Sequence, residues 1–198
     1  MKREVDARGE ACPKPVIMTK KALDEITDGV VITIVDNEVA KENVSKLAKS
    51  SGYEFEVDKK SDSEYYVQII KGESKEEANV CIPDTFKDMT IAFSSSTMGE
   101  GSEELGKILM KSFIYTLTES VPYPSTLVFY NGGVKLTCEG SEVLDDLKKL
   151  EEQGVEILSC GTCLDFFKIQ DKLQVGGVTN MYTILEKIKN PTNNIIIG

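Results

Sequence analysis

Hydrophobic positions in the first 72 residues alternate between the spacing of strands and the spacing of helices. Apolar runs at residues 30–35 and 65–70 have the length of buried strands. Val16, Leu23 and Ile26 instead recur on one face of a helix, with charged residues between them. We expect two helices on a small mixed sheet. The pattern predicts a strand, a helix, a strand, a helix and two strands, at residues 4–7, 13–26, 30–35, 39–51, 53–57 and 65–70.

A second alternation of strands and helices follows a polar, irregular stretch. Residues 73–87 lack clear periodicity and are interpreted as a linker between a domain at 1–72 and a domain at 88–198. The repeated order of strand and helix predicts a mostly parallel α/β domain. The expected strands lie at 89–94, 126–130, 155–158 and 195–197, and the expected helices at 102–117, 141–153, near 164, and at 180–188.

Charge and composition exclude several classes of function. The net charge is −10, with 12 basic and 14 acidic residues up to Gly72 and 11 basic and 19 acidic residues after it. An acidic second half disfavours direct binding of nucleic acid. No apolar run is long enough to cross a membrane and no secretion signal is apparent, so we expect a cytoplasmic protein. The absence of histidine excludes an imidazole base and histidine metal ligands within one chain.

The best candidate for chemistry is Cys12, which lies in Cys12-Pro13-Lys14-Pro15. Proline is tolerated in the first turn of a helix, so the two prolines fix the helix start and place Cys12 at its N-cap. Unpaired amides and the positive end of the helix dipole, with Lys14 nearby, would then stabilise a thiolate. The alternative is a buried cysteine that only packs.

Three loops follow expected parallel strands, at residues 94–101, 131–134 and 159–163, where ligand sites gather in such sheets. The last loop holds Cys160 and Cys163. The pair is compatible with a structural zinc site, for which the other ligands are missing, with a thioredoxin-like redox pair, or with a sulfur relay. In the relay, Cys160 would accept sulfur and Cys163 would resolve or pack. Cys81 and Cys138 are interpreted as packing residues.

The first domain resembles the TusA-like (SirA-like) sulfur carrier proteins. The likeness is carried by Asp6-Ala7-Arg8-Gly9, Cys12-Pro13-Lys14-Pro15 and Thr19-Lys20-Lys21-Ala22-Leu23. It implies a two-layer βαβαββ sandwich in which Cys12 carries a persulfide. Glu10 departs from the family, which usually has leucine there. The motif residues around the thiol are Asp6, Arg8, Gly9, Pro13, Lys14 and Pro15.

The second domain resembles DsrE-like domains, through Asn131-Gly132-Gly133-Val134-Lys135 and residues 159–166. This likeness implies homo-oligomers and, in several members, a sulfur relay through a cysteine. A fusion in this order is similar to the YedF family of sulfurtransferase-like proteins in selenium metabolism. It implies a cysteine desulfurase or another sulfur or selenium donor and a downstream acceptor protein as partners. It implies no cofactor beyond a persulfide or selenosulfide on cysteine.

The sequence therefore predicts a carrier of sulfur or selenium that accepts the atom on Cys12 and relays it through Cys160. Two other functions stay open. One is a thiol-disulfide oxidoreductase that uses Cys160 and Cys163, and the other is a non-catalytic adaptor for selenium or sulfur enzymes.

Overall fold

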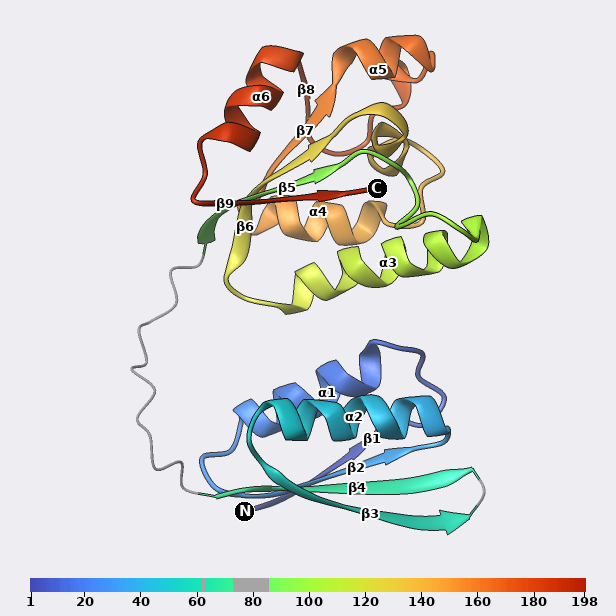
Figure 1. The fold of residues 1–198 in the computed structure, drawn as a ribbon, viewed down its shortest axis with the longest axis vertical. Helices are drawn as coiled ribbons and strands as arrows, with labels where there is room; N and C mark the ends of the chain where they lie inside the picture. The colour runs from blue at the N-terminus through green and yellow to red at the C-terminus, as the bar shows by residue number, and fades with distance from the viewer. Residues whose placement is uncertain (62, 73–85) are drawn as a thin grey trace. The chain divides into compact units, whose positions relative to one another are not determined.

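The chain divides into two compact units, Met1–Val80 and Cys81–Gly198 (Figure 1). The structure is a computed structural model that describes residues 1–61, 63–72 and 86–198. The expected linker at 73–87 lies outside the described residues, apart from its last two positions, which already belong to a strand. Each unit has its own hydrophobic core.

The first unit is a two-layer βαβαββ sandwich, as expected. Its two helices cover one face of a four-stranded sheet with the order β1-β2-β4-β3 (Figure 1). Strands β1 and β2 are parallel, and the other neighbours are antiparallel. The elements are β1 (Lys2–Asp6), α1 (Lys14–Asp24), β2 (Gly29–Val35), α2 (Glu38–Ser50), β3 (Glu54–Ser61) and β4 (Glu64–Lys71).

Local sequence explains where these elements begin and end. Asn37 caps α2, because its side-chain oxygen accepts a hydrogen bond from the Ala40 amide at 2.8 Å. Strand β3 runs to Ser61, four residues past its expected end, although residues 58–61 are polar. The backbone ladder to β4 does not depend on apolar side chains, and the side chains of this segment face solvent.

The second unit is an α/β domain with a fully parallel five-stranded sheet in the order β8-β7-β6-β5-β9. Helices α3 and α4 lie on one side of the sheet and α6 on the other (Figure 1). The strands are β5 (Phe86–Phe93), β6 (Tyr123–Phe129), β7 (Glu156–Cys160), β8 (Gly177–Thr179) and β9 (Asn193–Ile197). The helices are α3 (Glu103–Glu119), η1 (Asn131–Thr137), α4 (Leu144–Glu152), α5 (Gly161–Phe166), η2 (Gln170–Lys172) and α6 (Met181–Lys189).

The predicted mostly parallel α/β architecture is confirmed, with two additions. Strand β8 has only three residues, too few for a periodic signal, and pairs with β7 at the sheet edge. Residues 131–137, expected to begin as a loop, form the short 3-10 helix η1. Within the described ranges, no helix has both the length and the apolar character of a membrane span.

Candidate functional site

Cys12 lies in an exposed turn between β1 and α1. The turn spans residues 11–14 and is closed by a hydrogen bond from the Lys14 amide to the Ala11 carbonyl at 3.0 Å. Since the side chain of Cys12 is exposed, the alternative of a cysteine that only packs in the core is wrong. The thiol is accessible to a reaction partner.

The expectation that Cys12 is the N-cap of the first helix is also wrong. Helix α1 begins at Lys14, and Pro13 takes the N-cap position. Pro13 and Pro15 have no amide hydrogen, the Lys14 amide bonds to Ala11, and the Val16 amide bonds to the Pro13 carbonyl at 3.1 Å. The first turn of α1 therefore leaves no free amide to face the sulfur. The prolines fix the helix start and remove the donors expected there.

The sulfur of Cys12 lies instead beside a recess between the turn and the start of α2. The recess has a volume of about 70 Å³. The Asn43 side-chain amide Nδ2 donates a hydrogen bond to Cys12 Sγ at 3.7 Å, a long contact of the kind that sulfur acceptors make. The recess is lined by Glu10, Ala11, Cys12, Pro15, Val16, Asn37, Val39, Ala40 and Asn43.

Lys14, expected to support the thiolate, carries an ion pair at the rim of this recess. Its Nζ lies 3.0 Å from a carboxylate oxygen of Glu10. Both side chains are exposed to solvent, so the pair is weak and leaves opposite charges near the thiol. Glu10, the residue that departs from the resembled family, thus partly offsets the charge of Lys14.

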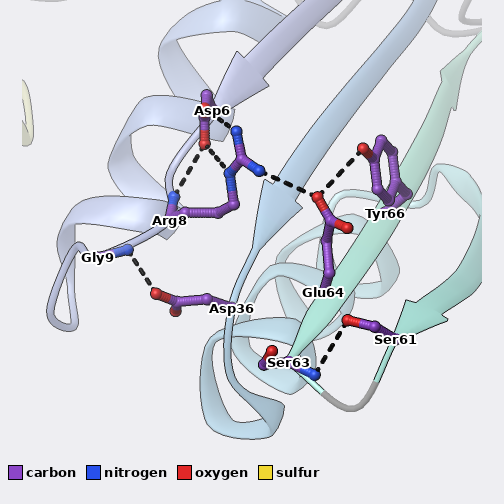
Figure 2. A network of polar contacts seen from close by, with 8 residues as sticks. All are labelled: Asp6, Arg8, Gly9, Asp36, Ser61, Ser63, Glu64 and Tyr66. Atoms are coloured by element: carbon purple, nitrogen blue, oxygen red, sulfur yellow. Dashed lines mark hydrogen bonds and ion pairs between the residues drawn. The ribbon is translucent and has the colours of Figure 1, made fainter.

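A polar network holds the segment that leads to the turn (Figure 2). Asp6, at the end of β1, accepts hydrogen bonds from the Arg8 amide at 3.2 Å, from Arg8 Nε at 2.9 Å and from Arg8 Nη2 at 2.6 Å. Arg8 Nη1 reaches Glu64 on β4 at 3.0 Å, and the Tyr66 hydroxyl donates to the same carboxylate at 3.4 Å. The network joins the chain after β1 to β4.

The electrostatics of this network favour ionised carboxylates. The hydrogen bonds from the side chain and the amide of Arg8 lower the pKa of Asp6 to about 2. Asp6 in turn raises the pKa of Arg8 above its ordinary value. Asp6 and Arg8 are therefore both charged throughout the neutral range. These two motif residues anchor the segment that leads to Cys12.

Gly9 provides the turn that brings the chain from this anchor to Cys12. Its φ of +75° is a conformation that glycine adopts without strain. Its amide donates to Asp36, which follows β2, at 2.6 Å (Figure 2). This bond, followed by one from the Asn37 side chain, lowers the pKa of Asp36. The same carboxylate therefore ties the thiol loop to the start of α2.

A buried pair of hydroxyl groups, on α1 and on β2, fixes the start of α1. Thr19 donates to the Pro15 carbonyl at 2.7 Å, and its oxygen lies 2.9 Å from the Thr33 hydroxyl on β2. With Thr19 as donor to Pro15, Thr33 donates to Thr19. Pro15 is thereby held against the sheet, and with it one wall of the recess.

The cysteines of the second unit differ in exposure. Cys160 ends β7 and is 1% exposed, whereas Cys163 on α5 is half-buried. The Asn131 amide donates to Cys163 Sγ at 3.1 Å, so η1 after β6 and α5 after β7 meet at the expected edge of the sheet. Residues 161–163, expected as part of a loop, are the first turn of α5. Burial, opposed by the Asn131 amide, raises the pKa of Cys163. The Cys163 thiol is therefore less readily ionised than the exposed thiol that the sequence suggested.

The other cysteines have simpler roles. Cys138 is buried, and its thiol donates to the Val134 carbonyl at 3.2 Å, which confirms that it packs in the core. Cys81 lies outside the described residues. Over the described residues, no three histidine, cysteine, aspartate or glutamate side chains gather as metal ligands.

Asn37 and Asn43 complete the site and were absent from the sequence-based set of site residues. The expected order of strands and helices contained a signal for these two residues. Because β1 and β2 are parallel, both helices that follow them begin at the same edge of the sheet. The residues of the first turns of α2 therefore had to lie near the start of α1, where Cys12 was expected.

Comparison with known proteins places the first unit. The profile of the family described as Sulfurtransferase TusA matches residues 3–71. A Methanocaldococcus jannaschii protein named "Putative sulfur carrier protein" is 34% identical over 70 residues, which are 35% of this chain and 93% of the relative. A Thermotoga maritima protein of the same name is 32% identical over 69 residues, which are 34% of this chain and 87% of the relative. The crystal structure of a SirA-like protein from Desulfitobacterium hafniense is 40% identical and covers 36% of this chain and 99% of that chain, with a TM-score of 0.35.

Proposed function

The chain belongs to the TusA sulfurtransferase family through residues 3–71, and from this premise we propose that it carries sulfur as a persulfide on Cys12. The observation that supports this most directly is the exposed thiol beside a small recess. An exposed sulfur can meet the sulfur of another protein, and a recess can shelter the atom afterwards. The anchor of Asp6, Arg8 and Gly9 holds the loop in place for this contact.

The transfer needs one nucleophilic step. The Cys12 thiolate attacks the terminal sulfur of a persulfide on the donor. A new S–S bond forms at Cys12 while the S–S bond of the donor breaks, and the donor cysteine leaves as a thiolate with that electron pair. The terminal proton stays on the transferred sulfur. No oxidant or reductant is consumed, and the same step in reverse delivers the sulfur to an acceptor thiol.

The donor that we propose is a cysteine desulfurase, and loading by such an enzyme tests the function. After incubation with the desulfurase and cysteine, mass spectrometry of the intact chain should show the addition of one sulfur. Peptide mapping should place it on Cys12. The variant Cys12→Ser should stay unmodified, because serine cannot form the S–S bond.

The variant Cys138→Ser is the matched control, since this cysteine is buried and outside the site. It should load like the unaltered chain. Equal loading of the Cys12→Ser variant and the unaltered chain would show that Cys12 is not the acceptor.

The same thiolate can accept selenium, and we propose that this chain carries selenium as a selenosulfide in selenium metabolism. Support comes from the resemblance to the YedF family and from chemistry, because both elements accept attack by a thiolate. A loading assay with selenocysteine in place of cysteine tests this part. Selenium on Cys12 is the expected result, and loading with sulfur alone would contradict it.

A relay through the second unit is a further part of the proposal. Cys160 was the expected relay residue, but its side chain is 1% exposed. An incoming persulfide would reach Cys163 first, because that side chain is half-buried. We therefore propose that sulfur passes from Cys12 to Cys163 and only then to Cys160. Labelled sulfur that leaves Cys12 should appear on Cys163. If it does not appear there over many turnovers, the proposed relay is wrong.

The close sequence spacing of Cys160 and Cys163 supports a second candidate function. The Cys160 side chain contributes to the raised pKa of Cys163, as a neighbouring thiol would. A thiol-disulfide oxidoreductase would form a reversible bond between them. A redox titration followed by mass spectrometry tests this: a disulfide within the pair supports the function, and two thiols at every potential exclude it.

We further propose that residues 88–198 form a DsrE-like domain that assembles into homo-oligomers. The fully parallel sheet and the meeting of η1 and α5 at the edge that bears Cys160 and Cys163 support this assignment. An exposed apolar row on α3, formed by Leu105, Ile108 and Leu109, supports assembly.

A further inference from the structure

The recess beside Cys12 lies where an atom added to the sulfur needs room. We propose that it holds the terminal sulfur of the persulfide and that the Asn43 amide is the hydrogen-bond donor to that sulfur. The inference rests on the proposed persulfide on Cys12. It adds a binding site for the carried atom and a residue that acts on it.

The recess has room for an added atom. Its volume is about 70 Å³, above the roughly 10–15 Å³ that a cavity needs to hold one water molecule. The terminal sulfur of a persulfide lies one S–S bond, about 2.05 Å, from Sγ. A sulfur at this distance can enter the recess, because Cys12 is one of its lining residues.

Asn43 is the side chain of the recess lining whose amide is directed at Cys12. Asn37 also lines the recess, but its oxygen accepts from the Ala40 amide at 2.8 Å and its nitrogen donates to Asp36 at 2.9 Å. For Asn43 Nδ2, the described residues offer Cys12 Sγ as acceptor, at 3.7 Å. The first turn of α1 contributes no free amide, as shown above. The Asn43 amide therefore points at the reacting sulfur.

The rest of the recess strengthens this contact. Pro15, Val16, Val39 and Ala40 form an apolar part of its lining. A hydrogen bond to a charged acceptor is stronger than one to a neutral acceptor, and more so where water is scarce. The terminal sulfur of a persulfide is more readily anionic than a thiol. Asn43 therefore stabilises the loaded state more than the empty one and slows the loss of the carried atom.

The variant Asn43→Leu tests the inference in the full chain, because leucine keeps the size of the side chain and removes the donor. The chain is loaded with a cysteine desulfurase and cysteine, separated from them, and exposed to cyanide, which removes the terminal sulfur. Intact mass spectrometry then follows the loss of one sulfur with time. The loss should be about tenfold faster than in the unaltered chain, the effect of one charge-assisted hydrogen bond.

A second measurement separates this role from a structural one. Alkylation of the unloaded thiol by neutral iodoacetamide should change less than about twofold, because the amide contributes little to the empty state. Asn43→Gln keeps an amide and should restore part of the lifetime. Asn190→Leu, the same substitution at the exposed asparagine that caps the C-terminal end of α6, is the matched control and should behave like the unaltered chain.

The possible results distinguish this inference from the proposed function. If the unaltered chain accepts no sulfur, the proposed function fails and this inference fails with it. If the unaltered chain loads and the Asn43→Leu variant keeps its sulfur equally long, this inference alone is overturned. It is also overturned if sulfur loss and alkylation accelerate together, since Asn43 would then only shape the recess.

Discussion

Glu10 brings a negative charge to the rim of the recess beside Cys12. Its pairing with Lys14 at 3.0 Å is exposed to solvent, so the two charges cancel only in part. A reagent that approaches Cys12 therefore meets both a carboxylate and an ammonium group. The balance between them tunes how charged partners approach the thiol.

Replacement of Glu10 by glutamine should raise the rate at which Cys12 reacts with an anionic disulfide reagent by about two- to fivefold, because one repulsive charge near the thiol is removed. The rate with neutral iodoacetamide should stay the same. Stopped-flow measurement of both reactions tests this, with Glu56→Gln on β3 as the control. Equal effects on both reagents would contradict the electrostatic explanation.

Asp6 gives the first unit a stability that depends on pH. Its pKa, held near 2 by Arg8, lies below the ordinary value of about 3.9. Ionised Asp6 therefore stabilises the folded state. This contribution to the free energy of unfolding is present above about pH 4 and is lost as the pH falls toward 2. The variant Asp6→Asn should be less stable than the unaltered chain at pH 6, and the difference should shrink toward pH 2.

Denaturant unfolding of the full chain, followed by NMR signals from the core of the first unit, measures this difference. Asp24→Asn, an exposed carboxylate of α1 outside the network, serves as the control. A stability difference for Asp6→Asn that is constant from pH 6 to pH 2 would contradict the role of the Arg8 contact.

Single-residue features were readable from the sequence where the chemistry is local. The exposed turn at Cys12 follows from two closely spaced prolines. The assignment of Cys12 as a thiolate-stabilising N-cap failed for two reasons. Two positions of the helix start are prolines without an amide hydrogen, and the Lys14 amide is bonded within the turn. Asn43 was missed because its contact with Cys12 joins the turn before α1 to α2 and depends on tertiary structure.

At the scale of elements, parallel pairing decides which side chains meet. Strands β1 and β2 run in the same direction, so α1 and α2 begin at one edge of the sheet, with Cys12 and Asn43 beside each other. The alternation of strands and helices was sufficient to predict both sheets. It could not reveal β8, because three residues carry no periodicity, and side chains alone could not show that the β3 ladder continues to Ser61.

Helix α3 carries an apolar row that the rest of the second unit does not cover. Leu105, Ile108 and Leu109 recur at helical spacing and are exposed, with Ile108 at 57%. An exposed apolar row of this kind is typical of an interface between protein surfaces. We expect it to join copies of this chain in the proposed oligomer of the second unit.

The substitution Ile108→Lys should shift the oligomer to a lower molar mass in light scattering, since a charge would be buried in the interface. The same charge at exposed Thr116, on the same helix, should leave the mass unchanged. An oligomer that survives Ile108→Lys would show that this row is not the interface.

At the scale of the whole molecule, the sulfur carrier relatives correspond to the first unit alone. The curated sulfur carrier relatives are covered over 93% and 87% of their length by a match of about 70 residues. Each of these relatives is therefore little longer than the matched region. The first unit of this chain has its own core and its own thiol site, so it should work in the same way when separated.

A fragment of residues 1–72 should fold and accept sulfur on Cys12 at a rate within about twofold of the full chain, because its core is self-contained. Circular dichroism and the desulfurase loading assay measure both properties. A folded fragment that cannot be loaded would show that the second unit contributes to the acceptor site.

The most direct test of the central claim is the order in which the cysteines acquire sulfur. A rapid-quench experiment with a cysteine desulfurase and isotopically labelled cysteine, followed by peptide mapping, resolves this order in the unaltered full chain. We predict that label appears first on Cys12 and reaches Cys163 and Cys160 only afterwards, and that Cys12→Ser abolishes label at all three. Label that appears on Cys163 or Cys160 before Cys12, or at an unchanged rate in the Cys12→Ser variant, would contradict the account.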